Sequence, residues 1–334
     1  MRNAHERRLL FGFLAALVLL TAARIAYVSP IAGERYFTKY THFADRAIAR
    51  DVDRERLPDL SPGYLWFVAL LRLLGADHWT LRGVQIAMTG VVAGCVALIA
   101  YRVSGTVAAI AAAAIVLTNK AALVNASDFE PETLILMLEA IALALLIGTR
   151  TSPRAEIAGG LCLGLATICR PVALLMAVAI GVWLWRASRR VPLAFGIAVA
   201  LPVMAIVAIN ARLTGSALIM DPGTVLYEGM NARATGCTGS RPGIIRDLEP
   251  TISTPDPLHV AYRIVAARAL GLERIPRERA NDYWMQKTIA YVRAAPGAAV
   301  RLTWQKALAA LHAGDTYDLY GMARVSRLMT IPIW

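Results

Sequence analysis

Two acids stand close to aromatic residues just after the first apolar segment of the chain. Glu34 and Asp45 belong to the stretch GERYFTKYTHFADRAIARD, residues 33–51. A carboxylate held beside apolar surface at a water–lipid boundary has a raised pKa and can act as a base toward a hydroxyl. The alternative is a solvated amphipathic helix, whose aromatic residues recur at helical spacing and lie on the interface. The pattern alone leaves both interpretations open.

An arginine interrupts a long apolar run. The run covers residues 157–185, and ICRPVAL places Arg170 and Pro171 near its middle. A planar guanidinium at this depth suits a phosphate carried by a lipid, because it offers two parallel N–H donors. A snorkelling or helix-capping arginine is the alternative.

More acids mark the start of another apolar run, NASDFEPETLILMLEA. Glu130 and Glu132 flank a proline, and acids at a helix start are favoured by the helix dipole. Glu139 lies deeper, where an acid normally faces other helices and has a partner. Lys120 and Arg170 are the candidate partners.

Apolar helices must position these residues. The chain of 334 residues is 57% hydrophobic and 17% charged, with a mean hydropathy of +0.52, which indicates an integral membrane protein. The apolar runs cover 9–28, 83–101, 106–124, 131–148, 157–185 and 192–209. As one helix, the run 157–185 would be roughly 43 Å long. We therefore interpret it as a hairpin of two short helices, which gives about seven spans.

Charge between the runs predicts which side each loop faces. With a cytoplasmic N-terminus, the hairpin leaves a group of arginines on the cytoplasmic side, as the positive-inside rule requires. The group is Arg2, Arg7, Arg8, Arg102, Arg150, Arg154, Arg186, Arg189 and Arg190. Residues 29–80, 119–130, Arg170 and everything from 210 onward then face outward together.

The expected fold is an all-α integral membrane bundle in two parts. Residues 1–210 form the transmembrane module, whose first outer loop, 29–80, contains a helix over 61–75 that is too short to span and should lie at the interface. Residues 211–334 form an outer region of amphipathic helices near 258–270, 278–294 and 297–312.

Several other functions find no support in the sequence. The net charge of +12 comes from basic residues at the ends of apolar runs, which is typical of membrane topology and not of a nucleic-acid partner. The histidines and cysteines lack metal-ligand spacing. Nucleotide-binding glycine motifs and the G-x-S-x-G motif are also absent from the sequence.

Six segments taken in order resemble the GT-C superfamily of polyprenyl-phosphate-dependent glycosyltransferases, in particular the protein O-mannosyltransferase-like branch (glycosyltransferase family 39-like). They are ERYFTKYTHFADRAIARD, SPGYLWFVALLRLLGADHWTLRGVQ, EPETLILMLEA, AGGLCLGLATICRPVALL, VLYEGMNARATG and WMQKTIAYVRAAPGAAVRLTWQKALAAL. Two positions depart from the family pattern: Glu34 replaces an aspartate, and Met230 replaces an asparagine.

The resemblance implies transfer of a sugar from a polyprenyl-phosphate carrier to a protein, lipid or glycan of the cell envelope. Transfer would occur on the extracytoplasmic face of a bacterial inner (plasma) membrane. Glu34, or else Asp45, would be the catalytic acid, and Arg170 would stabilise the departing lipid phosphate. The other substrate-binding residues expected are Tyr36, Lys39, Tyr40, His42, Tyr64, Glu130 and Glu132. The resemblance implies no certain cofactor beyond the lipid-linked sugar, and a divalent metal is left open.

Members of this family usually continue with further spans, so the resemblance implies a C-terminally truncated chain. Two alternatives to a transferase follow. One is an inactive or split fragment that acts as a membrane scaffold. The other is a lipid or solute transporter, which would place paired polar residues in the middle of the membrane and show internal repeats.

Overall fold

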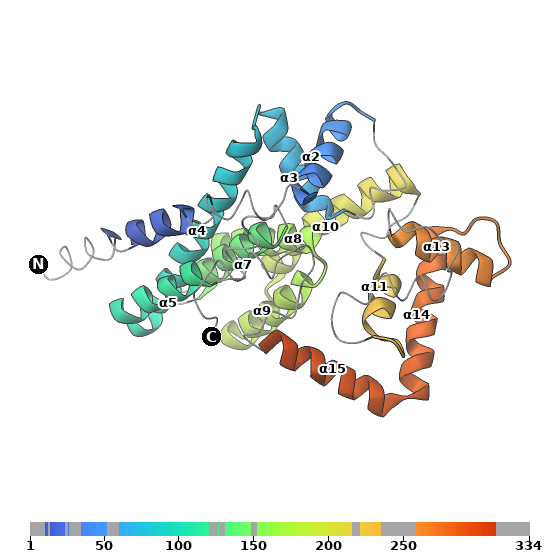
Figure 1. Cartoon of the computed structure of the whole chain (residues 1–334). Helices are drawn as coiled ribbons and strands as arrows, with labels where there is room; N and C mark the ends of the chain where they lie inside the picture. The colour runs from blue at the N-terminus through green and yellow to red at the C-terminus, as the bar shows by residue number, and fades with distance from the viewer. Residues whose placement is uncertain are drawn as a thin grey trace, which may run out of the picture. The chain divides into compact units, whose positions relative to one another are not determined.

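All the regular secondary structure that the structure describes is helical. The structure is a computed structural model, and it describes residues 11–12, 14–23, 26, 35–51, 60–119, 126, 131–147, 152–215, 221–234 and 258–311 (Figure 1). No strand occurs among these residues, so the all-α prediction is confirmed for them. The chain divides into two compact units, Met1–Asp53 with Leu60–Ile209 and Arg54–Asp59 with Asn210–Trp334.

The helices of the first unit follow the apolar runs. They are Leu14–Ala23, α2 (Arg35–Ile48), α3 (Pro62–Leu73), α4 (His78–Ser104), α5 (Thr106–Thr118), α7 (Glu132–Leu146), α8 (Pro153–Cys169), α9 (Ala173–Ser188) and the greater part of α10 (Leu193–Thr214). Local chemistry sets their starts. Asp77 accepts a hydrogen bond from the Thr80 amide at 2.7 Å, and Ser152 accepts one from the Ala155 amide at 3.2 Å.

Two helices are long and apolar enough to cross a membrane. They are α4 and α10, the latter over Leu193–Leu213. Four further apolar helices are shorter: Leu14–Ala23, Pro62–Leu73, Thr106–Thr118 and Ala173–Ser188. Length and composition therefore support a membrane protein, while the count of about seven spans stays a prediction.

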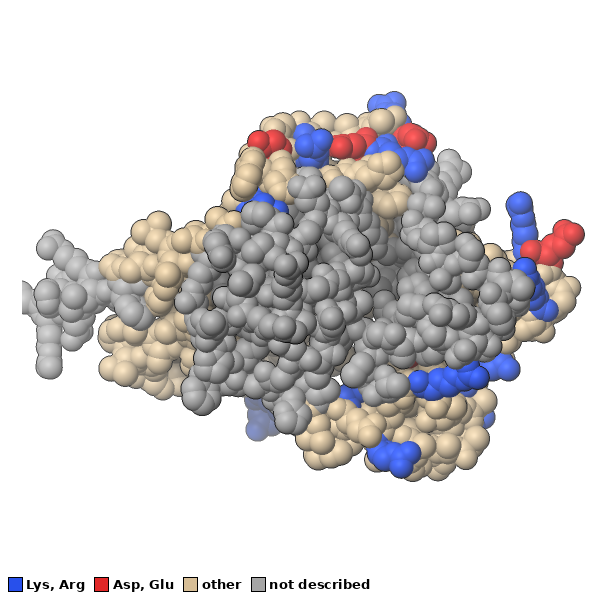
Figure 2. Space-filling view, in the orientation of Figure 1, with Lys and Arg blue, Asp and Glu red and all other residues tan. Residues whose placement is uncertain are grey.

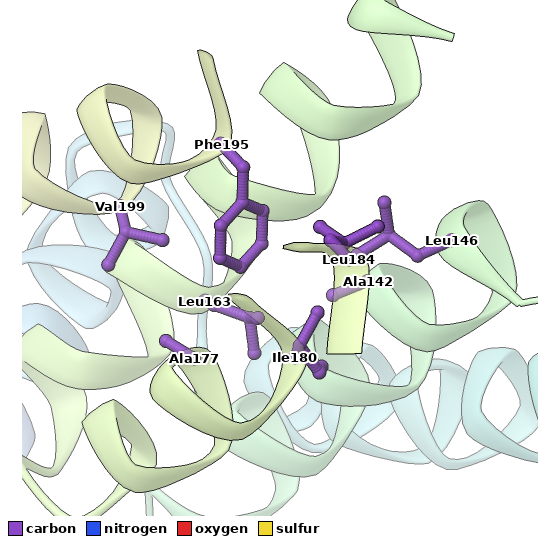
Figure 3. Close-up of a cluster of buried hydrophobic side chains, with 8 residues drawn as sticks. All are labelled: Ala142, Leu146, Leu163, Ala177, Ile180, Leu184, Phe195 and Val199. Carbon is purple, nitrogen blue, oxygen red and sulfur yellow. The ribbon is translucent and has the colours of Figure 1, made fainter. Parts of the chain in front are cut away.

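One hydrophobic core cluster of the first unit is built from four helices, two of which approach closely at glycines. Figure 3 shows its apolar side chains, from α7, α8, α9 and α10: Ala142, Leu146, Leu163, Ala177, Ile180, Leu184, Phe195 and Val199. Gly160 and Gly164 lie on the face of α8 that packs against α10. A Cβ at Gly160 would lie 2.6 Å from the Phe195 carbonyl oxygen, and one at Gly164 would lie 2.6 Å from that of Val199. The G-x-x-x-G spacing thus lets the two backbones approach closely.

A tight turn at Gly105 and the side chain of Arg102 connect the C-terminal end of α4 to its neighbours. Gly105 has φ +83°, which favours glycine, and it joins α4 to α5, where Ala97 packs against Ala109 and Ala113. Arg102 donates hydrogen bonds to the carbonyls of Ala144 and, at 2.9 Å, of Ile147. A cation therefore satisfies the last carbonyls of α7 and binds that helix end to the end of α4.

The second unit has its own core. It contains α11 (Pro222–Gly229), α13 (Leu258–Ala269), α14 (Arg277–Ala294) and α15 (Pro296–Leu311). Trp284 is fully buried among Tyr262, Val265 and Ala280, and its indole N–H donates to the Tyr262 carbonyl at 3.1 Å. The last three helices agree closely with the amphipathic segments predicted there.

Candidate functional site

The apolar run 157–185 breaks at the Arg-Pro pair, as predicted. Helix α8 ends at Cys169 and α9 begins at Ala173. Arg170 has an extended backbone, φ −145° and ψ 123°, because the proline ring that follows disfavours a helical conformation there. Its side chain is 47% exposed. The break therefore presents a guanidinium at the junction of two helices.

Glu132 holds this guanidinium from the first turn of α7. The Arg170 Nη2 atom forms an ion pair with Glu132 Oε1. The Glu132 side chain is 30% exposed, and its Oε2 atom is buried without a hydrogen-bond partner. Among the candidate residues, the structure thus joins Arg170 to Glu132, across 38 positions of sequence. The pair fixes the arginine at one place next to a carboxylate oxygen that has unused acceptor capacity.

Glu139 does not share this partner in the described part of the chain. It lies two turns further along α7, where it is partly buried. No ion pair of Glu139 occurs within the residues that the structure describes, and Lys120, the other candidate, lies outside them. The helical register explains the choice of Glu132, because the first turn of α7 and not its middle lies beside the end of α8.

The N-terminus of α3 is seated against the same end of α8. The Ser61 hydroxyl donates a hydrogen bond to the Cys169 carbonyl at 2.6 Å. At Gly63 the helices touch so closely that a Cβ would lie 2.7 Å from the Cys169 Sγ atom and 2.8 Å from Ile168 Cγ1. Sequence reasoning missed both residues as neighbours of Arg170, although SPGY, a proline-started helix with an early glycine, was the available signal.

Tyr40 and Tyr64 connect α2 to α3 in the interior. Tyr64 is 1% exposed, and its hydroxyl accepts a hydrogen bond from the Gln85 side-chain amide of α4. The Tyr40 ring is 6% exposed and meets the Tyr64 ring edge-on, with 4.7 Å between centroids. Gln85 itself is 2% exposed, and its Oε1 atom has no hydrogen-bond partner. These tyrosines are therefore part of the buried packing between α2, α3 and α4.

Asp45 is fully engaged with an arginine of α3. Arg72 donates from Nε to Oδ1 at 2.9 Å and from Nη2 to Oδ2 at 3.1 Å, and from Nη1 to the Ala76 carbonyl at 3.0 Å. The hydrogen bonds from Arg72 to Asp45 raise the pKa of the guanidinium. Both oxygens of Asp45 accept from one fork, so this acid joins α2 to the C-terminal end of α3.

The two candidate site residues Arg170 and Asp45 lie beside opposite ends of α3. Arg170 lies next to Ser61, and Asp45 contacts Arg72. Arg72 lies eleven positions after Ser61, which corresponds to about 16 Å along the helix axis. The structure therefore does not bring Asp45 to Arg170.

The remaining candidates divide by what the structure describes. His42 is exposed on α2, with its ring centroid 5.5 Å from that of Phe43. Tyr36 and Lys39 are residues of α2, for which the structure describes the backbone and not the side chains. Glu34 and Glu130 lie outside it entirely. Within the described residues, no three His, Cys, Asp or Glu side chains gather in a way that could hold a metal ion.

One comparison with known proteins gives a match. Residues 59–211 match the family described as dolichyl-phosphate-mannose-protein mannosyltransferase, which is just under half of the chain. The match contains Tyr64, Glu130, Glu132 and Arg170, and it begins after Asp45. No curated protein and no solved structure matches the chain.

Proposed function

We propose that this chain, which is a GT-C glycosyltransferase-like membrane protein, transfers a sugar from a polyprenyl-phosphate carrier to an acceptor hydroxyl. The observation that carries the proposal is the Arg170–Glu132 pair at the break between α8 and α9, inside the matched segment. The site would face the extracytoplasmic side of a bacterial inner membrane. A protein, lipid or glycan would be the acceptor.

Three links within the first unit support a common face for these residues. Ser61 with Cys169 and Glu132 with Arg170 join segments that the charge pattern assigns to the outside. Arg102 with Ile147 joins two segments that it assigns to the cytoplasm. None of these three links joins a cytoplasmic segment to an outer one. This is what a membrane bundle in the proposed orientation requires.

The reaction needs a cation at the leaving group. The acceptor oxygen forms a bond to the anomeric carbon of the sugar, and the bond from that carbon to the phosphate oxygen breaks, so that polyprenyl phosphate departs with the electron pair. Negative charge grows on the phosphate as the bond breaks, and the Arg170 guanidinium would stabilise it. Glu132 would position that guanidinium before the donor arrives.

The proton of the acceptor hydroxyl requires a base. Tyr40 contacts Tyr64 near the start of α3, and Asp45 contacts Arg72 near its end, so α2 and α3 run in the same general direction. Glu34 directly precedes Arg35, the first residue of α2, in the sequence. We propose Glu34 as the base, with Asp45 holding α2 to α3.

Exchange of each acid for its amide separates these roles. We expect Glu34→Gln to lower the transfer rate by about 100- to 10,000-fold, the usual contribution of a general base. Asp45→Asn should leave the rate within about tenfold, because an exposed ion pair is worth little free energy. The measurement is transfer of radiolabelled sugar from its polyprenyl phosphate by the purified variants. Unchanged transfer by Glu34→Gln would remove Glu34 from the scheme, and a large loss in Asp45→Asn alone would make Asp45 the base.

A further inference from the structure

Helix α15 of the second unit presents an apolar stripe on one face. Val300, Trp304 and Leu308 are 70%, 64% and 42% exposed, and their spacing of four residues places them along one side of the helix. The opposite side is anchored: Ala299 and Leu302 are buried, and Lys306 donates a hydrogen bond to the Gly229 carbonyl at the end of α11. The stripe therefore faces away from the core of its own unit.

The charge around the stripe has one sign. From Tyr283 to Leu311 the sequence contains Lys287, Arg293, Arg301 and Lys306 and no acid. Figure 2 shows basic and no acidic side chains over this part of the surface. Arg301 is exposed and directly follows the first residue of the stripe. Basic residues beside a narrow apolar face are typical of helices that lie in an anionic membrane interface.

We propose that α15 binds the surface of an anionic bilayer, with Val300, Trp304 and Leu308 inserted at the headgroup boundary. Tryptophan is favoured there because its ring is apolar and its N–H can reach water. A protein partner fits less well, since a stable interface takes about 800 Å² and 20–30 residues from each side, and the stripe offers three. This contact is independent of sugar transfer, so its test does not depend on activity.

Depth-dependent quenching of Trp304 tests the proposal in the full chain. The protein is reconstituted into vesicles of phosphatidylcholine with phosphatidylglycerol, and the Trp304 signal is taken as the difference from a Trp304→Phe variant. We expect lipids brominated near the top of the acyl chain to quench this difference signal at least twofold, and aqueous acrylamide to quench it weakly. Arg301→Gln, or vesicles of phosphatidylcholine alone, should reduce the quenching by lipid.

A matched control moves the indole by one position. The double variant Trp304→Phe, Gln305→Trp places the indole at the exposed position 305, about 100° around the helix from Trp304. Acrylamide should quench the indole there, and bromolipid should not. Two outcomes overturn the proposal. Quenching of Trp304 by acrylamide but not by bromolipid would place the stripe in water, and protection from both quenchers would mean that protein covers it.

Discussion

Replacing Arg170 by glutamine lowers kcat for sugar transfer by about 100- to 1,000-fold. The physical reason is the lost donor at the departing phosphate, because removal of one preorganised donor from a developing anion costs a factor of this size. The fold should survive, since the Arg170–Glu132 pair is partly exposed and contributes little to stability. The measurement is steady-state transfer from a polyprenyl-phosphate sugar, with kcat and KM determined separately.

Two further variants show whether the geometry of the guanidinium matters. Arg170→Lys keeps the charge but loses the planar fork, so we expect an intermediate loss of rate. Arg186→Gln removes an exposed arginine from the last turn of α9, which the charge pattern places on the cytoplasmic side, and should leave transfer unchanged. Full activity of Arg170→Gln would contradict a phosphate-binding role. If that variant fails to fold, Arg170→Lys with the same kcat as the unaltered protein would contradict it equally.

Replacing Arg277 by methionine destabilises the helix pair α11 and α14 by about 3–5 kcal/mol. Arg277 Nε lies 2.5 Å from Asp221 Oδ1, and the two side chains are 7% and 8% exposed. Asn281 completes the contact by accepting a hydrogen bond from the Gly223 amide at 2.6 Å. Loss of the arginine leaves a buried carboxylate without its counter-charge, which is why the cost is large.

The effect of this variant should depend on pH. Burial raises the pKa of Asp221, and the Arg277 guanidinium opposes that rise. In Arg277→Met most of this opposition is lost, although Arg263 still lowers the pKa, so the folded-state pKa of Asp221 rises further above its unfolded value. The stability of the variant is then highest below the unfolded pKa and falls as pH rises through the folded one. Hydrogen exchange of the α11 and α14 amides at several pH values measures the free energy of unfolding of this helix pair.

Matched substitutions separate the buried charge from the loss of packing. Arg279→Met changes an exposed arginine of the same helix and should stay within about 0.5 kcal/mol of the unaltered protein. The double variant Asp221→Leu, Arg277→Met removes both charges and should recover most of the loss, because an apolar pair can replace a buried ion pair without penalty. A double variant as unstable as Arg277→Met would show that the charge is not the cause.

The sequence predicted many of the helices and the break after α8, but not α11. Apolar runs predict α4, α5, α7 and α10 because a helix in an apolar environment is apolar on all its faces. Arg170 with Pro171 predicts the break after α8, since a residue that precedes proline avoids the helical conformation. These features depend on local chemistry, which a sequence displays directly.

The pairings across the fold could not be predicted. Ser61 meets Cys169 across 108 positions, and Arg277 meets Asp221 across 56. Such contacts depend on which turn of one helix lies beside which turn of another, and a shift of one residue rotates a side chain by about 100°. For the same reason, the sequence offered Arg170 as a partner for Glu139, whereas the structure pairs it with Glu132.

The candidate acids show the same limit. Glu34 and Asp45 are close in sequence and similar in surroundings, so the pattern could not choose between them. Of the two, the structure describes only Asp45, which meets Arg72 at the end of α3 that is far from Ser61. The contact of Asp45 with Arg72 assigns that acid a structural role, and Glu34 as the base is a proposal.

Release of polyprenyl phosphate is the most direct measure of sugar transfer by this chain. The purified chain, reconstituted in lipid, is incubated with a set of polyprenyl-phosphate sugars and envelope acceptors, and the free lipid phosphate is measured over time. We predict release from at least one donor that requires an acceptor and is lost by about 100-fold or more in Arg170→Gln. Release at the same rate in that variant would contradict the role of Arg170, and no release from any donor by a folded protein would contradict sugar transfer.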